Sequence, residues 1–193
     1  GLDLINIIAT QNDSLVRSIG VAPLVPPFGS FRYKPYQIAV RSDDRFIYAT
    51  LQGTGQVAVI ERDTLANTFT WHDSITVGTT PLQCEATRDR RYLYVCNRGS
   101  NNVSVIDAQT NRFLANISNV GRQPHGIDIS DDSRTVYVTC ENVQAAEPPH
   151  HAVAGSITPA FLTVVDVGTQ SVIKRIEIGG FGAGVSVYPG KGN

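Results

Sequence analysis

Apolar and polar residues alternate along many short stretches of the chain, and turn residues separate these stretches. The alternation is clear at Val103 and Val105 and again at Ile127 and Ile129, as expected for β-strands whose two sides face different surroundings. The segment 98–101, RGSN, is typical of the turns, because Asp, Asn, Ser and Gly favour tight connections. Nothing reads as a long amphipathic helix. The pattern predicts an all-β protein.

One unit of this pattern recurs three times. The copies begin at Pro35, Pro81 and Pro124 and read PYQIAVRSDDRFIYATL, PLQCEATRDRRYLYVCN and PHGIDISDDSRTVYVTC. The prolines are 46 and 43 residues apart, and two further sets of aligned residues keep the same spacings. These sets are Arg45, Arg91 and Arg134, and Tyr48, Tyr94 and Tyr137. A meandering β-sandwich does not predict a register shared by three markers.

The second half of each unit repeats as well. The segments QVAVIERDTLANTFTWHDSITVG, NVSVIDAQTNRFLANISNVG and FLTVVDVGTQSVIKRIEIGG each contain a strand that ends near an acidic residue, a polar turn and a second strand that runs to Gly. Each unit therefore has four short strands. Four-stranded units of roughly 40–45 residues are the sequence signature of a β-propeller, whose sheets bury their faces against one another around an axis.

The register divides the chain into a partial set of blades. Residues 1–20 match the end of a blade, 35–79, 80–122 and 123–180 are full blades, and 183–193 resembles the first strand of a next or closing blade. The alternatives are a four-bladed ring with an irregular closure and part of a larger ring. We favour the larger ring, because the sequence contains no methionine and its first residue is then a processed or truncated end.

The segment RYLYVCNRGSNNVSVIDAQTNRFLANISNVGRQPHGIDISDDSRTVYVTC makes the pattern specific. It resembles the YVTN repeat, with Tyr137-Val138-Thr139 in place and Cys140 where the motif has Asn. The resemblance extends over nearly the whole chain. It implies a propeller of about seven blades of the YncE-like and surface-layer type, found in secreted, periplasmic or cell-surface proteins of bacteria and archaea. The resemblance therefore implies an extracytoplasmic location. Such proteins mostly bind or scaffold other molecules, so the resemblance transfers no catalytic residue.

Composition narrows the possible functions. The net charge is -1, with charged residues at 17%, so the basic excess that nucleic-acid binding needs is missing. No run of residues approaches the ~18 apolar positions of a membrane span. We expect neither a nucleic acid nor a membrane as partner.

Two long insertions, 20–35 and 142–160, are predicted to lie on one face of the propeller. Each strand reverses direction, so the connectors between blades and those between second and third strands meet on the same side. Binding residues concentrate on loops held by a rigid scaffold. This face is therefore the predicted functional face.

Five candidate metal ligands lie at this face of the third full blade: His125, Cys140, Glu141, His150 and His151. Histidine, thiolate and carboxylate are ligands for zinc or copper. The alternative is structural: His125 lines the axis, Cys140 is a small buried residue, and the adjacent histidines lie on a loop surface. The sequence contains no closely spaced ligand motif such as CxxC, and no CxxCH motif for haem attachment.

Aromatic residues gather in the first insertion and just after it: Phe28, Phe31, Tyr33 and Tyr36. They are predicted either to form a partner-binding patch, since aromatics are favoured at interfaces, or to fold down over the core. The leading hypothesis is a non-enzymatic module that binds protein partners or a surface polymer, or assembles with other chains or with the rest of its own propeller. The alternative is a metal-binding or oxidoreductase-associated propeller.

Overall fold

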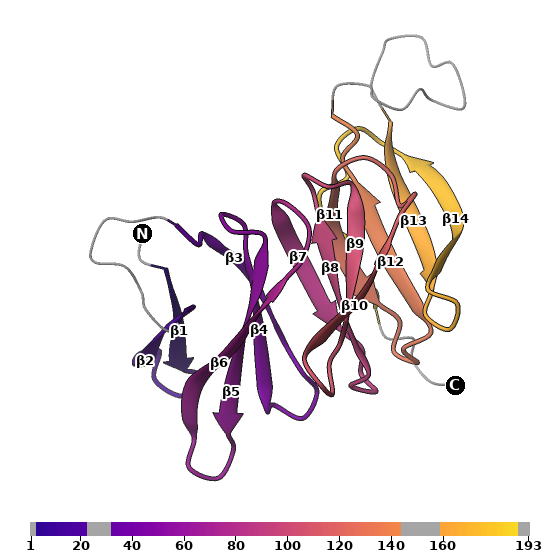
Figure 1. Cartoon of the computed structure of the whole chain (residues 1–193). Helices are drawn as coiled ribbons and strands as arrows, with labels where there is room; N and C mark the ends of the chain where they lie inside the picture. The colour runs from indigo at the N-terminus through magenta and orange to yellow at the C-terminus, as the bar shows by residue number, and fades with distance from the viewer. Residues whose placement is uncertain (1–2, 23–31, 144–158, 189–193) are drawn as a thin grey trace.

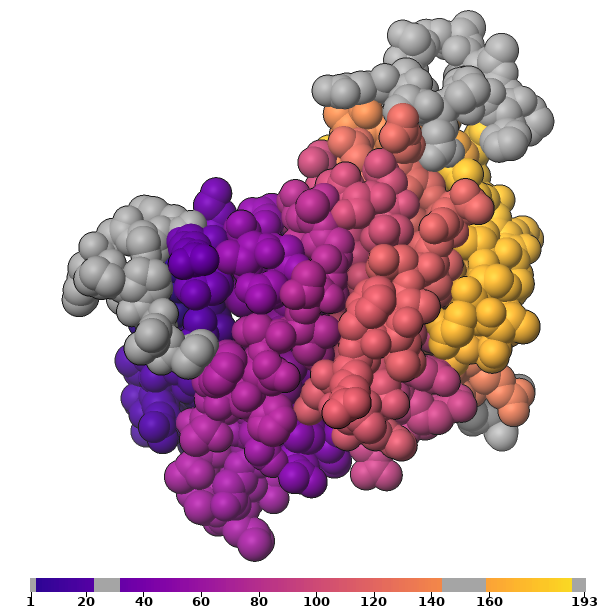
Figure 2. Space-filling view, in the orientation of Figure 1, coloured from indigo at the N-terminus to yellow at the C-terminus, as the bar shows by residue number. Residues whose placement is uncertain are grey.

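The computed structural model describes residues 3–22, 32–143 and 159–188. Within these residues every regular element is a β-strand, and the strands form three four-stranded antiparallel sheets and one two-stranded sheet. No helix in the described part is long and apolar enough to cross a membrane. Figure 1 shows the four sheets side by side in chain order, and the space-filling view shows their colours as successive bands across the surface (Figure 2).

The strands are named by the sheet to which they belong. The half-blade comprises β1 (Leu4–Ala9) and β2 (Ser14–Gly20). The first blade comprises β3 (Pro35–Val40), β4 (Phe46–Leu51), β5 (Gln56–Asp63) and β6 (Thr68–Thr76). The second blade comprises β7 (Pro81–Ala86), β8 (Tyr92–Asn97), β9 (Asn102–Asp107) and β10 (Arg112–Ile117). The third blade comprises β11 (Pro124–Ile129), β12 (Thr135–Cys140), β13 (Ala160–Asp166) and β14 (Ser171–Ile178).

The blades are arranged around a common axis. In each blade the first strand is innermost and the other three follow outward in chain order, and β7 lies against both β3 and β11. Sheets ordered in this way are the blades of a propeller. The prediction of an all-β propeller is confirmed.

Residues with a left-handed backbone recur at equivalent positions in the turns. In the turn after each innermost strand they are Asp44, Arg90 and Ser133, with φ angles of 58°, 64° and 59°. Positive φ is uncommon for residues other than glycine. A chain that adopts it three times at spacings of 46 and 43 residues is repeating one turn geometry.

The core consists of three apolar clusters, each between neighbouring sheets. Successive residues of a strand face opposite sides, so in β4 Ile47 and Ala49 pack toward the half-blade while Phe46 and Tyr48 pack toward the second blade. Full burial of a side chain such as Ile47 or Phe46 stabilises the fold by roughly 1.5–3 kcal/mol. The first blade therefore depends on the sheets on both of its sides.

The two faces of the propeller carry different connections. We call the side where β3, β7 and β11 begin, and where β4, β8 and β12 end, the connector face. The opposite side, with the turns 41–45, 87–91 and 130–134, is the turn face. The connectors from β2 to β3 and from β12 to β13 both join strand ends at the connector face.

Neighbouring innermost strands are joined by side chains rather than by a backbone ladder. Gln37 Oε1 accepts the Cys84 N–H at 2.8 Å, and Asp128 Oδ2 accepts the Val187 N–H at 2.5 Å. The second contact places residues 183–188 beside β11, although these residues form no strand. The chain after the third blade thus follows the path of a further innermost segment.

Candidate functional site

Four polar side chains from all three blades meet at the connector face. Tyr36 and His125 are the second residues of β3 and β11, whereas Arg98 and Glu141 directly follow β8 and β12. We call Tyr36, His125, Glu141 and Arg98 the connector-face row. Because innermost strands start and second strands end on the same side, the propeller topology brings these positions together at the mouth of the axis.

Glu141 is the buried centre of the row. Its side chain is 3% exposed, and its Oε2 accepts two hydrogen bonds from Arg98, from Nε at 2.9 Å and Nη2 at 2.7 Å. Burial by itself would raise the pKa of Glu141. The hydrogen bonds and charges of Arg98 and His125 outweigh it and lower the pKa below the ordinary value. Glu141 is therefore ionised at neutral pH.

His125 lies between Glu141 and Tyr36. Its Nδ1 is hydrogen-bonded to Glu141 Oε1, and its Nε2 lies 2.9 Å from the Tyr36 hydroxyl. An ionised carboxylate only accepts hydrogen bonds, so Nδ1 must carry a proton. In a neutral imidazole Nε2 is then an acceptor, and the Tyr36 hydroxyl donates to it.

The outer end of the row is open to solvent. Tyr36 is 47% exposed, and its ring lies 6.0 Å from the His125 ring, centroid to centroid, at 57°. The side chains form a continuous path of hydrogen bonds from Arg98 to an exposed hydroxyl. The arrangement can orient a histidine and place a base beside that hydroxyl.

Three of the predicted site residues are thus brought together, namely Tyr36, His125 and Glu141. Cys140 lies apart: it is fully buried, and its Sγ donates to the Val120 carbonyl oxygen at 3.2 Å. Adjacent strand residues point to opposite sides, so Cys140 and Glu141 cannot both face the axis mouth. The structural alternative had Cys140 as a small buried residue, and Cys140 is buried.

Of the remaining predicted residues, the structure describes only Tyr33, which lies away from this site. Tyr33 is half-buried against the half-blade, where its N–H donates to Asp3 Oδ2 at 3.3 Å. Phe28, Phe31, His150 and His151 lie outside the described residues. Within the ranges 3–22, 32–143 and 159–188, no group of three or more His, Cys, Asp or Glu side chains lies close enough to hold a metal ion. Metal binding stays a prediction.

Arg98 is the member of the row that sequence reasoning missed. The repeat register contained a signal for it, because Gln52, Arg98 and Glu141 occupy one position of the unit, 46 and 43 residues apart. Opposite charges at the same position of adjacent blades predict an ion pair between them. Tyr36, Leu82 and His125 likewise share one position.

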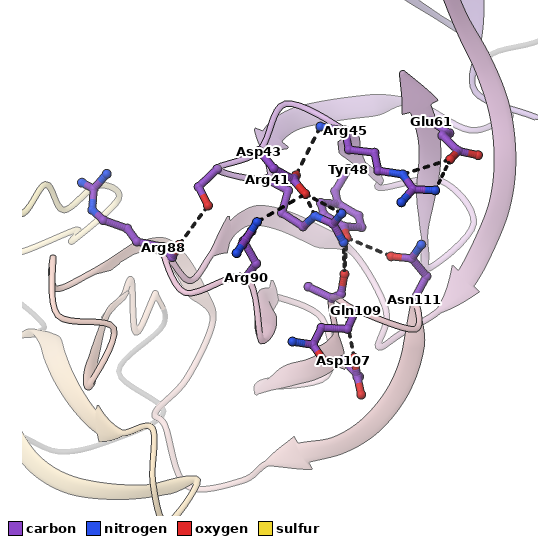
Figure 3. A network of polar contacts seen from close by, with 12 residues as sticks. Arg41, Asp43, Arg45, Tyr48, Glu61, Arg88, Arg90, Asp107, Gln109 and Asn111 are labelled. Atoms are coloured by element: carbon purple, nitrogen blue, oxygen red, sulfur yellow. Dashed lines mark hydrogen bonds and ion pairs between the residues drawn. The ribbon is translucent and has the colours of Figure 1, made fainter. Parts of the chain in front are cut away.

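The turn face carries a second polar network, which is shown in Figure 3. Arg41 is buried there, its Nε and Nη2 donate to the two carboxylate oxygens of Asp43 at 2.9 and 2.8 Å, and its Nη1 donates to the Ala108 carbonyl at 2.6 Å. Beside it, Tyr48 donates to Asn111 Oδ1 at 2.8 Å. The contacts join the first blade to the second.

The same contact recurs one blade further on. Tyr94 is fully buried and donates to Gln170 Oε1 at 3.0 Å, as Tyr48 does to Asn111. Asn111 and Gln170 both adopt a positive φ, 56° and 52°. The conserved geometry of the two contacts indicates a structural link between successive blades.

Two carboxyl groups lie nearer the axis. Glu85 and Asp128 help to line a small cavity of about 110 Å³ together with Ser42 and Arg88. Burial, with a smaller contribution from the charge of Asp128, raises the pKa of Glu85 to about 7. Glu85 therefore changes its charge near neutral pH.

The fold and the site define a β-propeller with a row of polar side chains across the mouth of its axis. The chain belongs to the YNCE-like beta-propeller family, which matches residues 29–189. The resemblance to YncE-like proteins seen in the sequence is confirmed. No curated protein matches the chain.

Solved structures with the same fold include proteins of several origins. One is "Kuenenia stuttgartiensis Hydrazine Synthase", 25% identical, with a TM-score of 0.63, covering 81% of this chain and 39% of that one. A functionally unknown protein from Desulfotomaculum acetoxidans is 14% identical, with a TM-score of 0.65 and coverages of 91% and 49%. A protein from Lactobacillus plantarum is 16% identical, with a TM-score of 0.66 and coverages of 94% and 50%. The chain spans half or less of the length of these solved chains.

Proposed function

We propose that this protein is a non-enzymatic, extracytoplasmic binding module that attaches to a surface polymer or a protein partner through its connector face. The observation that carries the proposal is the connector-face row. It combines an exposed phenol, a histidine and an arginine at the mouth of the axis, and the two longest connectors of the sequence join strands at the same face.

The chemistry of the row suits recognition of a polar ligand. Tyrosine and arginine are favoured in binding sites because each combines a large contact area with directional hydrogen bonds. The Arg98–Glu141 ion pair fixes both partners, so little side-chain entropy remains to be lost on binding. The extracytoplasmic location rests on what the family resemblance implies.

Cosedimentation with purified bacterial cell walls tests the surface-polymer form of this proposal. We compare the unaltered chain with a variant in which a short Gly-Ser linker replaces residues 144–158, and with the double variant Tyr36→Ala, Arg98→Ala. Both variants should bind at least about tenfold more weakly, the effect of losing roughly 1.4 kcal/mol.

Leu65→Ser is the matched control. Leu65 is 98% exposed at the tip of the β5–β6 hairpin, on the turn face, and its replacement should leave binding unchanged. Failure of the unaltered chain to bind cell walls would reject the surface-polymer form, and equal binding by all variants would reject the connector face.

A second candidate is a propeller that accompanies an oxidoreductase. The similarity to a chain of the hydrazine synthase structure favours it, since that protein is named for an enzymatic activity. The metal form of this candidate would use His125 and Glu141 with His150 and His151. Metal analysis of the purified protein tests it: stoichiometric zinc or copper that is lost in His125→Ala would support this form, and a metal-free protein would reject it.

A further inference from the structure

The connector-face row has the organisation of an activated nucleophile. Such a site needs a nucleophile and a base within about 2.6–3.2 Å of each other, with the base oriented by a third group. The Tyr36 hydroxyl and His125 Nε2 are 2.9 Å apart. Glu141 holds the other ring nitrogen of His125. Arg98 in turn fixes the second oxygen of Glu141.

The protonation states agree with this organisation. The lowered pKa of Glu141 keeps it ionised, which places the proton of a neutral imidazole on Nδ1 and leaves Nε2 as the base. Proton transfer to Nε2 gives an imidazolium whose Nδ1–H still donates to the Glu141 carboxylate. The row therefore contains both a site for the phenol proton and a charge that balances it.

We propose that Tyr36 is a nucleophile that accepts acyl groups from activated esters, with His125 as its general base. The Tyr36 oxygen forms a bond to the carbonyl carbon of the ester, and the hydroxyl proton passes to His125 Nε2. The bond from that carbon to the leaving oxygen breaks, and the leaving phenoxide takes the proton from Nε2 to become the phenol. The products are O-acyl-Tyr36 and the free phenol.

The other tyrosines that the structure describes lack the combination found at Tyr36, which is an exposed side chain with its hydroxyl hydrogen-bonded to a histidine. Tyr48 and Tyr94 are fully buried and donate to side-chain amides. Burial raises the pKa of both hydroxyls, that of Tyr48 to about 12. Tyr188 is 86% exposed. Among the described residues, only Tyr36 has its hydroxyl hydrogen-bonded to a histidine.

Tyr188 therefore serves as an internal reference, because it is a highly exposed tyrosine whose hydroxyl has no hydrogen bond to a histidine in the part of the chain that the structure describes. The purified full chain is treated with p-nitrophenyl acetate, and peptide mapping by mass spectrometry follows acetylation of each tyrosine with time. General-base assistance contributes typically 10²–10⁴-fold. We expect Tyr36 to be acetylated at least about tenfold faster than Tyr188 despite its lower exposure. A Tyr36 rate equal to or below the Tyr188 rate overturns the proposal, and this comparison requires no variant.

Variants assign the roles within the row. His125→Phe keeps an aromatic ring of similar size and should reduce the Tyr36 rate to the Tyr188 rate or below. Tyr36→Phe should abolish the fast phase of p-nitrophenol release, whereas Tyr188→Phe should leave it intact. A fast Tyr36 rate that persists in His125→Phe overturns the role of the base.

Glu141 is tested as a positioning residue. Glu141→Gln should slow acetylation of Tyr36 about tenfold while the Tyr188 rate in the same molecules stays constant, and Glu141→Asp, which keeps the charge, should restore part of the Tyr36 rate. Equal rates in the Gln and Asp variants would show that the charge has no part. The two proposals fail separately, because acetylation of Tyr36 and Tyr188 and cosedimentation with cell walls are both measured on the unaltered chain. Binding without fast acetylation of Tyr36 rejects only the nucleophile, and fast acetylation without binding rejects only the surface-polymer form of the proposed function.

Discussion

The turn face and the connector face use polar side chains in different ways. At the turn face one contact recurs at two successive blade interfaces: Tyr48 of the first blade donates to Asn111 of the second, and Tyr94 of the second donates to Gln170 of the third. At the connector face equivalent positions carry different residues, such as Tyr36 and His125, and these meet each other across the axis.

The two faces differ in whether a polar contact is repeated from blade to blade or made only once. A contact that every blade interface needs is repeated with the blades, because each interface presents the same problem of packing. A contact made once, from unequal residues at equivalent positions, solves no general packing problem. The connector-face row is of this second kind, and the following variants test the distinction.

The largest effect on the stability of the fold is expected for a replacement of Arg41. Arg41→Met removes the hydrogen bond to the Ala108 carbonyl, the paired contacts with Asp43 and the guanidinium 4.4 Å from the Phe46 ring centroid. We expect a loss of about 2–3 kcal/mol in the free energy of unfolding, measured by urea denaturation.

Arg45→Met is the matched control for Arg41→Met. Arg45 pairs with Glu61 at 2.9 Å, and both side chains reach solvent. Exposed ion pairs are worth about 0–1 kcal/mol. An Arg45→Met cost equal to that of Arg41→Met would show that burial does not distinguish the two arginines.

The next-largest effect on stability is expected at Glu85, which lies near the axis. The pKa of Glu85 is raised to about 7 by burial and by Asp128, partly opposed by Arg88. A carboxyl group with a raised pKa in the folded state stabilises the fold fully at low pH, and this contribution is lost as pH rises through 7. The free energy of unfolding of Glu85→Gln, relative to that of the unaltered chain, should therefore increase as pH rises from 5 to 8, by an amount on the order of 1–2 kcal/mol.

Denaturation curves for the Glu85→Gln variant and the unaltered chain at several pH values provide the measurement. A stability difference that stays constant from pH 5 to pH 8 would contradict the assignment of Glu85 as the titrating group. A difference that changes in the opposite direction would show that Glu85 is held in its charged form.

Removal of one buried hydroxyl has a smaller effect. Tyr48→Phe leaves Asn111 Oδ1 without its buried donor and should cost about 1–1.5 kcal/mol of unfolding free energy. Tyr94→Phe removes the equivalent donor to Gln170 and should cost a similar amount. Thermal and urea denaturation of both variants would check this equality, and a large inequality would mean that the two blade interfaces are not equivalent.

The smallest effect on stability is expected for the same chemical change at the connector face. Tyr36→Phe removes a hydroxyl from a side chain that is half exposed, so water can solvate His125 Nε2 in its place. We expect a change within about 0.5 kcal/mol by urea denaturation. A cost as large as that of Tyr48→Phe would place Tyr36 among the structural links between blades.

The amino-acid sequence by itself determined the blades and their faces. Three markers with common spacings of 46 and 43 residues specify the repeat, and the reversal of each strand specifies which connectors share a side. These features are local or periodic, so they can be read without coordinates. On that basis Tyr36, His125 and Glu141 were already predicted at one face, although in two separate groups.

Only the tertiary structure decided which side chains meet. Tyr36 and His125 are 89 residues apart, and their contact depends on how closely the first and third blades approach across the axis. Arg98 reaches Glu141 because both follow second strands of adjacent blades that end at the connector face, whereas Cys140 faces the buried side of its strand. Residue type and spacing specify the strands, but the site depends on the distance between blades and on the direction of each side chain, which packing of the whole propeller sets.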